Sequence, residues 1–250
     1  MMKEFLEKQV QRINNKAFIE TDPVQFLHRY ERLQDIEIVS FCVATIAWGR
    51  REMILHSAER MLAKMGESPY EYVMCEGYEM LGEANVHRTF FEPDLAYMLR
   101  GFHKILSENE SIESFLKKRH AKDAWQITEV IQAAMQQANG GKTNARNLFS
   151  LNFEKSALKR LNLALRWLVR RDGIVDLGVW KLLKSSELYI PLDVHVANIS
   201  RKLGILQRKQ NDRRAVEELT AALRGFCPED PVKYDFALFG IDIGEQKIFG

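Results

Sequence analysis

Asp193 is a residue whose type and position in the chain suggest chemistry. It follows Pro191 and precedes apolar residues at helical spacing, so we expect it to begin a helix. An aspartate at that position accepts backbone N–H bonds and lies at the positive end of the helix dipole, which makes capping its plainest role. Asp193-Val194-His195 also contains metal-ligand types, but side chains at adjacent positions of a helix start usually diverge.

Basic residues gather in the helix predicted just before Asp193. Between Ser156 and Arg171, leucines recur at helical spacing, while Lys159, Arg166 and Arg170 share another face, which predicts a buried helix with a basic side. Residues 141–214 hold 16 Lys and Arg against 6 Asp and Glu, whereas the remaining residues hold 20 against 28. The net charge of +2 therefore conceals a +10 segment, which suits binding to phosphates, although a solvated face is the commoner meaning of such a run.

Several other classes of site are disfavoured by the sequence. The three cysteines form no CxxC pair and are too few for a four-cysteine iron–sulfur cluster. Gly140-Gly141-Lys142-Thr143 resembles the end of a phosphate-binding loop, but Gln136 stands where that loop needs glycine, so we interpret it as a helix terminus and loop. No HExxH motif, signal peptide or membrane-spanning run is present, and we expect a cytoplasmic protein without metal or other cofactor.

Helical periodicity extends along nearly the whole chain, and it predicts an all-α fold. Helices are expected at about residues 22–32, 35–48, 50–64, 95–108, 111–119, 125–138, 156–171, 193–204, 212–226 and 230–240. Three of them begin with an Asp–Pro step or with aspartate just after proline. Gly49 separates two long helices by a short turn that contains Trp48.

The segment that contains Asp193, Ile190 to Gly204, resembles the motif (V/L)D-x-H-V-x-R-(V/I)-x-x-R-L-G of the helix-hairpin-helix DNA glycosylase superfamily. In that superfamily the aspartate is catalytic and sits at a helix N-terminus, and Asp193 falls on it. Bifunctional members carry a lysine in the helix upstream, for which Lys159 is the candidate and Lys181 an alternative. The spacing is similar to that of the archaeal 8-oxoguanine glycosylase branch. The whole chain also resembles an uncharacterised bacterial family placed near these glycosylases.

This resemblance implies a two-lobed helix-hairpin-helix DNA glycosylase-like fold with a central cleft. One lobe would be a helical barrel of residues 33–170, and the other would combine residues 1–32 with 171–250. The base pocket would contain Trp48, Asp235 and Phe239, whereas Trp167 is expected in the core. Contacts to DNA would come from Arg50, Lys155, Arg160, His195, Arg201 and Lys202.

One departure from the family concerns its L-P-G-V-G hairpin, which binds a DNA phosphate. Ser150-Leu151-Asn152-Phe153-Glu154-Lys155-Ser156 stands there instead, so phosphate binding would fall to helix N-termini and to side chains such as Lys155 or Arg160. The four-cysteine cluster of some members is also absent.

The function implied by the resemblance is excision of an oxidised purine such as 8-oxoguanine from double-stranded DNA, with AP-lyase activity, by a monomer. A carboxylate would stabilise the developing oxocarbenium ion, and a deprotonated lysine amine would attack C1′. Two alternatives stay open: a nucleic-acid-binding protein on the same fold without excision activity, and a helical interaction protein whose basic face binds an acidic partner.

Overall fold

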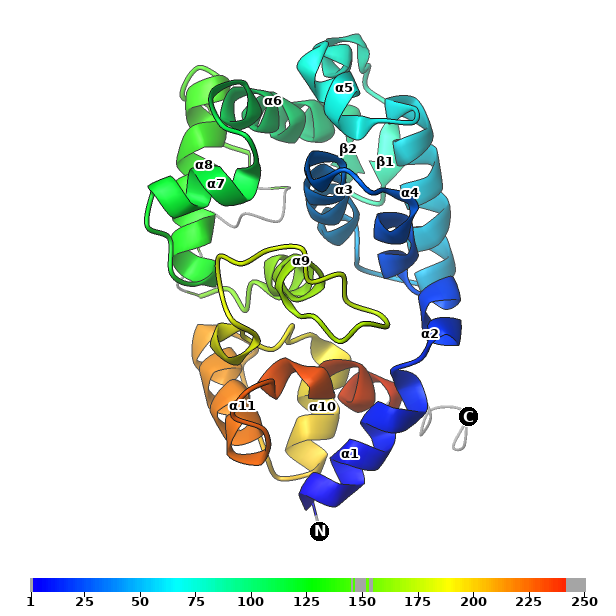
Figure 1. Ribbon diagram of the computed structural model, residues 1–250, viewed down its shortest axis with the longest axis vertical. Coiled ribbons are helices and arrows are strands. Elements are labelled where there is room, and N and C mark those ends of the chain that lie inside the picture. Colours follow the sequence, from blue (N-terminus) through cyan, green and yellow to red (C-terminus); the bar gives the residue numbers. More distant parts are fainter. Residues whose placement is uncertain (1, 145, 147–151, 153–154, 242–250) are drawn as a thin grey trace.

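The computed structural model describes residues 2–144, 146, 152 and 155–241, and these residues form an all-α fold. Figure 1 shows an upper group of elements, a lower group, and α9 (Lys159–Val169) between them. The upper group contains α3 (Leu33–Thr45), α4 (Arg51–Met65), α5 (Pro69–Met74), η2 (Gly77–Met80), β1 (Asn85–His87), β2 (Phe90–Phe91), α6 (Glu92–Glu108), α7 (Ile112–Lys118) and α8 (Ala124–Ala138). The two short strands pair antiparallel.

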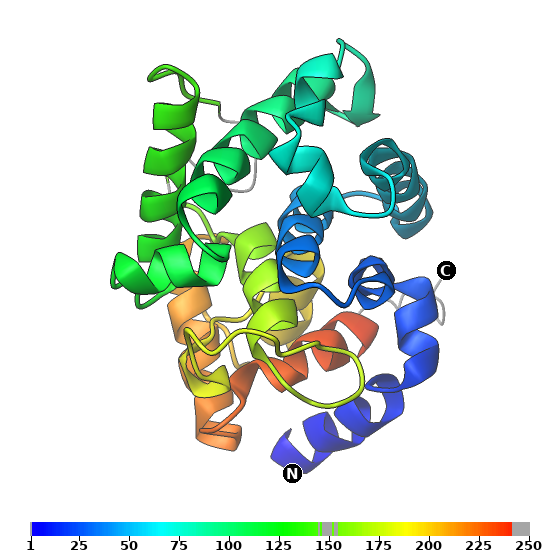
Figure 2. The ribbon, with the colours of Figure 1, turned by 45° about the horizontal axis from the view of Figure 1, so that its top comes forward.

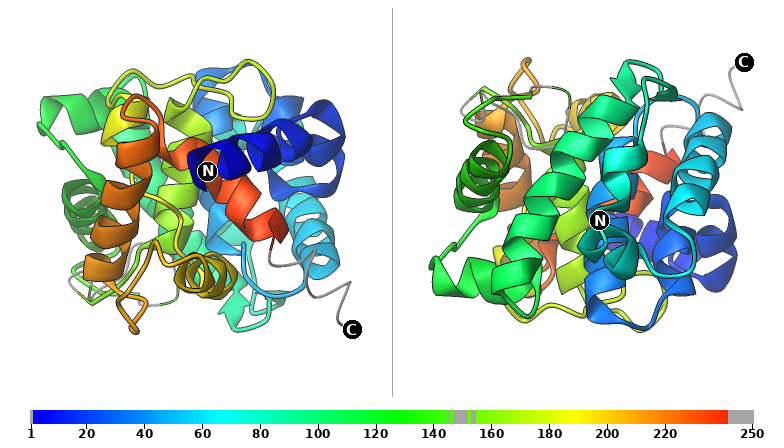
Figure 3. Two further views of the ribbon diagram at one scale, coloured as in Figure 1. Left: turned by 90° about the horizontal axis from the view of Figure 1, so that it is seen from below. Right: turned by 90° about the horizontal axis from the view of Figure 1, so that it is seen from above.

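The lower group joins the two ends of the described chain. It contains α1 (Met2–Ile13), α10 (Val194–Lys202), α11 (Arg213–Phe226), η4 (Pro231–Tyr234) and the helical residues 235–241, while α2 (Lys16–Thr21), η1 (Pro23–Arg29) and η3 (Ser185–Glu187) lie in connecting segments. α1 crosses the C-terminal helical segment, as the view from below shows (Figure 3), and Tyr234 donates a 2.7 Å hydrogen bond to Glu7. Buried apolar residues form a continuous core from Leu6 to Leu238. The division into lobes at residues 33 and 170 stays a prediction.

Three of the five helix starts predicted at aspartates are confirmed by a side-chain cap, whereas Asp230 precedes η4 without one and Asp35 lies inside α3. Asp22, Asp193 and Asp212 each accept a backbone N–H bond at the start of η1, α10 and α11, respectively. The predicted helix terminus is also found at the end of α8, where Gly140 and Gly141 adopt positive φ angles of 63° and 80°. Local capping signals therefore place the ends of several elements correctly.

Two acidic residues inside the central helix α3 have a role that the sequence does not reveal. α3 begins at Leu33, before Asp35, and its residues from Asp35 to Thr45 are buried. Asp35 accepts hydrogen bonds from Ser68 Oγ and Tyr70 N at the start of α5, and Glu37 accepts from two backbone N–H groups at the start of α7. Burial raises the pKa of Glu37 to about 7. These carboxylates thus cap neighbouring helices from within the core.

Packing of α3 against α9 fixes the centre of the molecule, where Figure 2 shows the two helices side by side. Trp167 of α9 is fully buried, which confirms its expected place in the core. No helix within the described ranges is long and apolar enough to cross a membrane. The start of α9 and the end of α3 emerge together at the edge of this core, and the candidate site lies there.

Candidate active site

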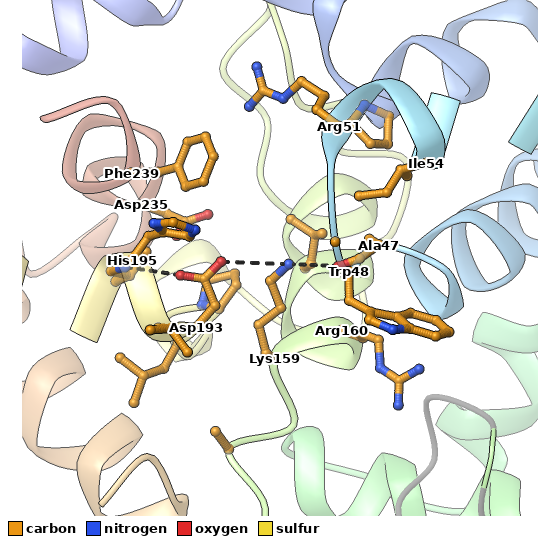
Figure 4. Close-up of a pocket in the computed structure, with 18 of the residues that line it drawn as sticks. Ala47, Trp48, Arg51, Ile54, Lys159, Arg160, Asp193, His195, Asp235 and Phe239 are labelled. Atoms are coloured by element: carbon orange, nitrogen blue, oxygen red, sulfur yellow. Dashed lines mark hydrogen bonds and ion pairs between the residues drawn. The ribbon is translucent and has the colours of Figure 1, made fainter. Parts of the chain in front are cut away.

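A pocket of about 820 Å³ opens where the α3–α4 turn, α9, α10 and the C-terminal helix meet (Figure 4). The predicted site residues on its wall are Trp48, Arg50, Lys159, Arg160, Asp193, His195, Asp235 and Phe239. Four other lysines and arginines considered from the sequence, Lys155, Lys181, Arg201 and Lys202, do not line it. Folding therefore brings together side chains from four segments that are far apart in the sequence.

Asp193 is held at the edge of the pocket by the start of α10. Its Oδ1 accepts a 2.9 Å hydrogen bond from the backbone N–H of Val196, while Oδ2 lies 3.8 Å from Lys159 Nζ. Pro191 and Leu192 are buried just before it and anchor the chain. The carboxylate keeps 24% of its side-chain surface exposed, so a ligand in the pocket can approach it.

Lys159 is the first residue of α9, and the chain enters this helix through a left-handed residue, Leu158, with φ 47°. The Lys159 amine donates a 3.0 Å hydrogen bond to the backbone oxygen of Ala47, just beyond α3 (Figure 4). Its side chain is 27% exposed. The amine is thus directed by a carbonyl and a carboxylate, and both it and Asp193 are open to the pocket.

Lys181 lies elsewhere in the fold. It is exposed, and its backbone N–H donates to the Glu113 carboxylate of α7. Of the two lysines left open by the sequence, Lys159 is the one that the fold places beside Asp193. An amine and a carboxylate 3.8 Å apart can act on one substrate atom, the amine as a nucleophile and the carboxylate by stabilising positive charge.

Arg160 and Trp48 form the adjoining wall. Arg160 donates a 2.7 Å hydrogen bond to the backbone oxygen of Thr45, and its guanidinium lies 5.1 Å from the centre of the Trp48 ring. His87 bonds the Trp48 backbone oxygen at 2.8 Å and Ser57 Oγ at 3.0 Å. Burial lowers the pKa of His87, which favours the neutral ring. The turn after α3 is therefore held by Arg160 from one side and His87 from the other.

Gly49 in this turn is required by its backbone conformation. It has φ +98°, and a Cβ on it would lie 2.6 Å from Nη1 of Arg88, a residue in the β1–β2 turn. Arg88 and the exposed Arg50 both line the pocket. Sequence reasoning missed Arg88 because a lone arginine in a short hairpin carries no motif.

Asp235 lies at the buried end of the pocket. It accepts a 2.8 Å hydrogen bond from Arg166, whose side chain is 1% exposed and also binds Asp176. Burial raises the pKa of Asp235 to about 7, and the Arg166 charge lowers it by less. Phe239 packs beside His195 with ring centres 5.6 Å apart (Figure 4). Asp235 and Phe239 thus share the wall with Asp193, while their predicted roles stay predictions.

Arg51 and Asp22 are further pocket residues that the sequence did not single out as site residues. Arg51 begins α4, and its Nη2 lies 3.5 Å from Oδ2 of Asp22, the residue that caps η1. Burial raises the pKa of Asp22. Asp22 was recognised from the sequence as a helix cap. Its capping position gives no indication that its other carboxylate oxygen lies near an arginine 29 positions away.

The remaining predicted DNA contacts lie outside the pocket. Lys155 and Lys202 are exposed. Arg201 donates hydrogen bonds to the backbone oxygens of Arg208 and Lys209 and to Asn211 Oδ1, so its side chain holds the loop after α10. In the segment expected at the position of the glycosylase hairpin, Ser150, Leu151, Phe153 and Glu154 lie outside the described residues.

The basic side predicted for the helix of residues 156–171 is largely buried in the structure. Arg166 and Arg170 are buried, and their acidic partners are Asp172, Asp176, Asp230 and Asp235. Two of these aspartates come from the C-terminal segment, so part of the +10 balance is neutralised by residues outside it. A helix-periodic basic face can turn inward when carboxylates from other segments meet it.

No group of three or more His, Cys, Asp or Glu residues in the described parts of the chain is arranged to hold a metal ion. Asp193 and His195 in particular have other contacts, with Val196 and with the Phe239 ring.

Comparison with known proteins gives one match. Residues 22–244 match the family described as protein of unknown function (DUF2400). Neither the curated proteins nor the solved structures contain a match. Because the match covers most of the chain, including every residue that lines the pocket, the chain belongs to the DUF2400 family.

Proposed function

We propose that the protein is a DNA glycosylase with AP-lyase activity that removes an oxidised purine such as 8-oxoguanine from double-stranded DNA. The observation that carries the proposal is the 3.8 Å approach of Lys159 Nζ to Asp193 Oδ2 at the wall of an open pocket. Asp193 aligns with the catalytic aspartate of the resembled motif, and Lys159 is the lysine expected upstream of it. The two-lobed glycosylase fold is part of the same proposal.

The chemistry assigned to the pair follows from charge. Breaking the C1′–N bond builds positive charge on the sugar, and the Asp193 carboxylate stabilises it. The Lys159 amine, once deprotonated, forms a bond to C1′ while the base leaves with the electrons of the C1′–N bond and takes up a proton. The attached nitrogen then loses a proton while the C1′–O4′ bond breaks and O4′ takes up a proton, which opens the sugar and gives a Schiff base. Loss of a C2′ proton from this Schiff base breaks the C3′–O bond and releases the 3′ phosphate. The Ala47 carbonyl positions the amine for this attack.

The pocket suits a base that has left the duplex. Its volume of about 820 Å³ accommodates a purine, and its wall contains the aromatic rings of Trp48 and Phe239. Arg50 and Arg88 lie at the same pocket and supply positive charge for the phosphate backbone. The Trp48 turn is held by hydrogen bonds from Arg160 and His87, and it would present such contacts to the opened duplex.

Borohydride trapping tests the proposal. Incubation with a duplex that contains 8-oxoguanine, or with one that contains a preformed abasic site, is expected to give a covalent protein–DNA adduct on reduction. The adduct should disappear in Lys159→Ala and persist in Lys181→Ala, which has the same change of side chain outside the pocket. Absence of adduct and of base release with oxidised, deaminated and alkylated duplexes would leave a nucleic-acid-binding role, which steep salt dependence of duplex binding would identify.

A further inference from the structure

Asp22 and Arg51 form a second polar pair in the pocket, and Figure 4 shows Arg51 across from Lys159 and Asp193. Asp22 Oδ1 accepts a 3.0 Å hydrogen bond from the backbone N–H of Val24. Its Oδ2 accepts no hydrogen bond from the described residues and lies 3.5 Å from Arg51 Nη2 as an ion pair. The Asp22 side chain is 9% exposed and lines the pocket, so a ligand bound there can donate to this oxygen in place of water.

Arg51 presents hydrogen-bond donors at the same pocket, and its side chain is 32% exposed. Its guanidinium lies between two aromatic rings, 5.6 Å from the centre of Phe18 and 5.1 Å from that of Phe239. None of the hydrogen bonds between described residues uses its five N–H donors, whereas Arg29, which lies over Phe26, donates two to Glu59. The rings fix the position of the guanidinium, and its donors stay available to a ligand.

We propose that Asp22 and Arg51 together read the edge of the excised base, and that this base carries a carbonyl next to an N–H group. The inference rests on the proposed glycosylase function and names the substrate class of that site. A donor beside an acceptor complements an amide-like edge: the base carbonyl accepts from Arg51, and its neighbouring N–H donates to Asp22. 8-Oxoguanine, hypoxanthine and uracil present such an edge. 1,N6-Ethenoadenine presents neither group.

Two substitutions test this pair, and the first of them keeps the shape of the side chain. In Asp22→Asn the amide still caps η1, because asparagine is as good a cap as aspartate, but the group facing the ligand no longer carries an anionic acceptor. Arg51→Gln removes the guanidinium. Matched controls are Asp123→Asn, which changes another helix cap outside the pocket, and Arg29→Gln, which breaks an ion pair and an aromatic contact at the surface.

The experiment measures single-turnover base excision from duplexes containing 8-oxoguanine, hypoxanthine, uracil or ethenoadenine, and strand cleavage at a preformed abasic site. The abasic duplex needs Lys159 but offers no base to read. Wild type should excise at least one of the carbonyl bases at least tenfold faster than ethenoadenine. In Asp22→Asn and Arg51→Gln the ratio of carbonyl-base excision to abasic-site cleavage should fall at least tenfold, and the two controls should keep the wild-type ratio.

Every other outcome contradicts either base reading by Asp22 and Arg51 or the proposed glycosylase function. Excision of ethenoadenine as fast as every carbonyl base, or an unchanged ratio in both variants, refutes base reading by this pair while the glycosylase function stands. An equal loss of both activities, with a lowered melting temperature, assigns the pair a structural role only. Failure of the wild type to excise any base and to cleave the abasic site rejects the proposed function itself.

Discussion

The two halves of α9 carry the same kind of side chain in opposite surroundings. In the first turn, Lys159 and Arg160 lie at the pocket and donate to backbone oxygens at the end of α3. Further along, Arg166 and the adjoining Arg170 are buried and bind carboxylates. The first pair can contact a ligand in the pocket, whereas the second pair forms ion pairs inside the protein.

The difference shows that burial decides whether a basic side chain forms structural ion pairs or stays available to a ligand. A buried arginine needs carboxylate partners, because an unpaired charge in the core is strongly destabilising. A partly exposed lysine keeps solvent contact and needs few partners, so it can change its partner when a substrate arrives. Variants of the residues in both regions test this difference.

Lys159→Ala is expected to have the largest effect, a loss of abasic-site cleavage on the order of 1,000-fold or more, because it removes the proposed nucleophile. Its melting temperature should change little, since the side chain is partly exposed and one carbonyl hydrogen bond contributes about 1 kcal/mol. Single-turnover cleavage and thermal unfolding measure both effects, with Lys181→Ala as the control. If Lys159→Ala were unfolded at room temperature, Lys159 would have a structural role like that of Arg166, and the difference between the two halves of α9 would not hold.

Arg166→Met should instead lower the free energy of unfolding by about 3–5 kcal/mol, because it leaves Asp176 and Asp235 buried without this partner. Urea denaturation at pH 7 measures the change. The control is Arg29→Met, which breaks an exposed ion pair and should cost about 1 kcal/mol or less. Equal costs for the two variants would contradict the structural role of the buried network.

Asp235→Asn tests the pKa of about 7 in the buried network. Between the unfolded pKa, about 4, and this value, the folded protein keeps a proton that the unfolded chain releases, so the free energy of unfolding falls as pH rises. This contribution is at most about 1.4 kcal/mol per pH unit and is absent in the variant. Urea midpoints at pH 5, 6 and 7 should therefore decline less steeply for Asp235→Asn; parallel declines would show that the carboxyl titrates normally.

Arg50→Gln and Lys202→Gln should have the smallest effect. Both residues are exposed, and each lost phosphate contact reduces the slope of log affinity against log salt by about 0.9. Duplex binding at several salt concentrations measures the slope. Lys118→Gln, on α7, should leave it unchanged, and an equal change in that control would show that the basic residues act only through net charge.

Local signals in the sequence located much of the scaffold. Aspartate caps at Asp22, Asp193 and Asp212 were predicted because capping involves residues a few positions apart. Asp35 and Glu37 were not recognised as caps, because the helices they cap lie more than 30 residues away. The same limit explains why Arg51 and Arg88 were missed in the pocket.

The sequence alone was enough for the all-α fold and for Asp193 at the start of its helix, because periodicity and capping act over one or two turns. Lys159 was expected inside a helix that begins at residue 156, and the structure makes it the first residue of α9. Only the tertiary structure decided that Lys159 rather than Lys181 meets Asp193, and that Arg166 turns inward to aspartates from other segments. Distances between residues far apart in the chain depend on how the helices pack, and that packing is a property of the whole core.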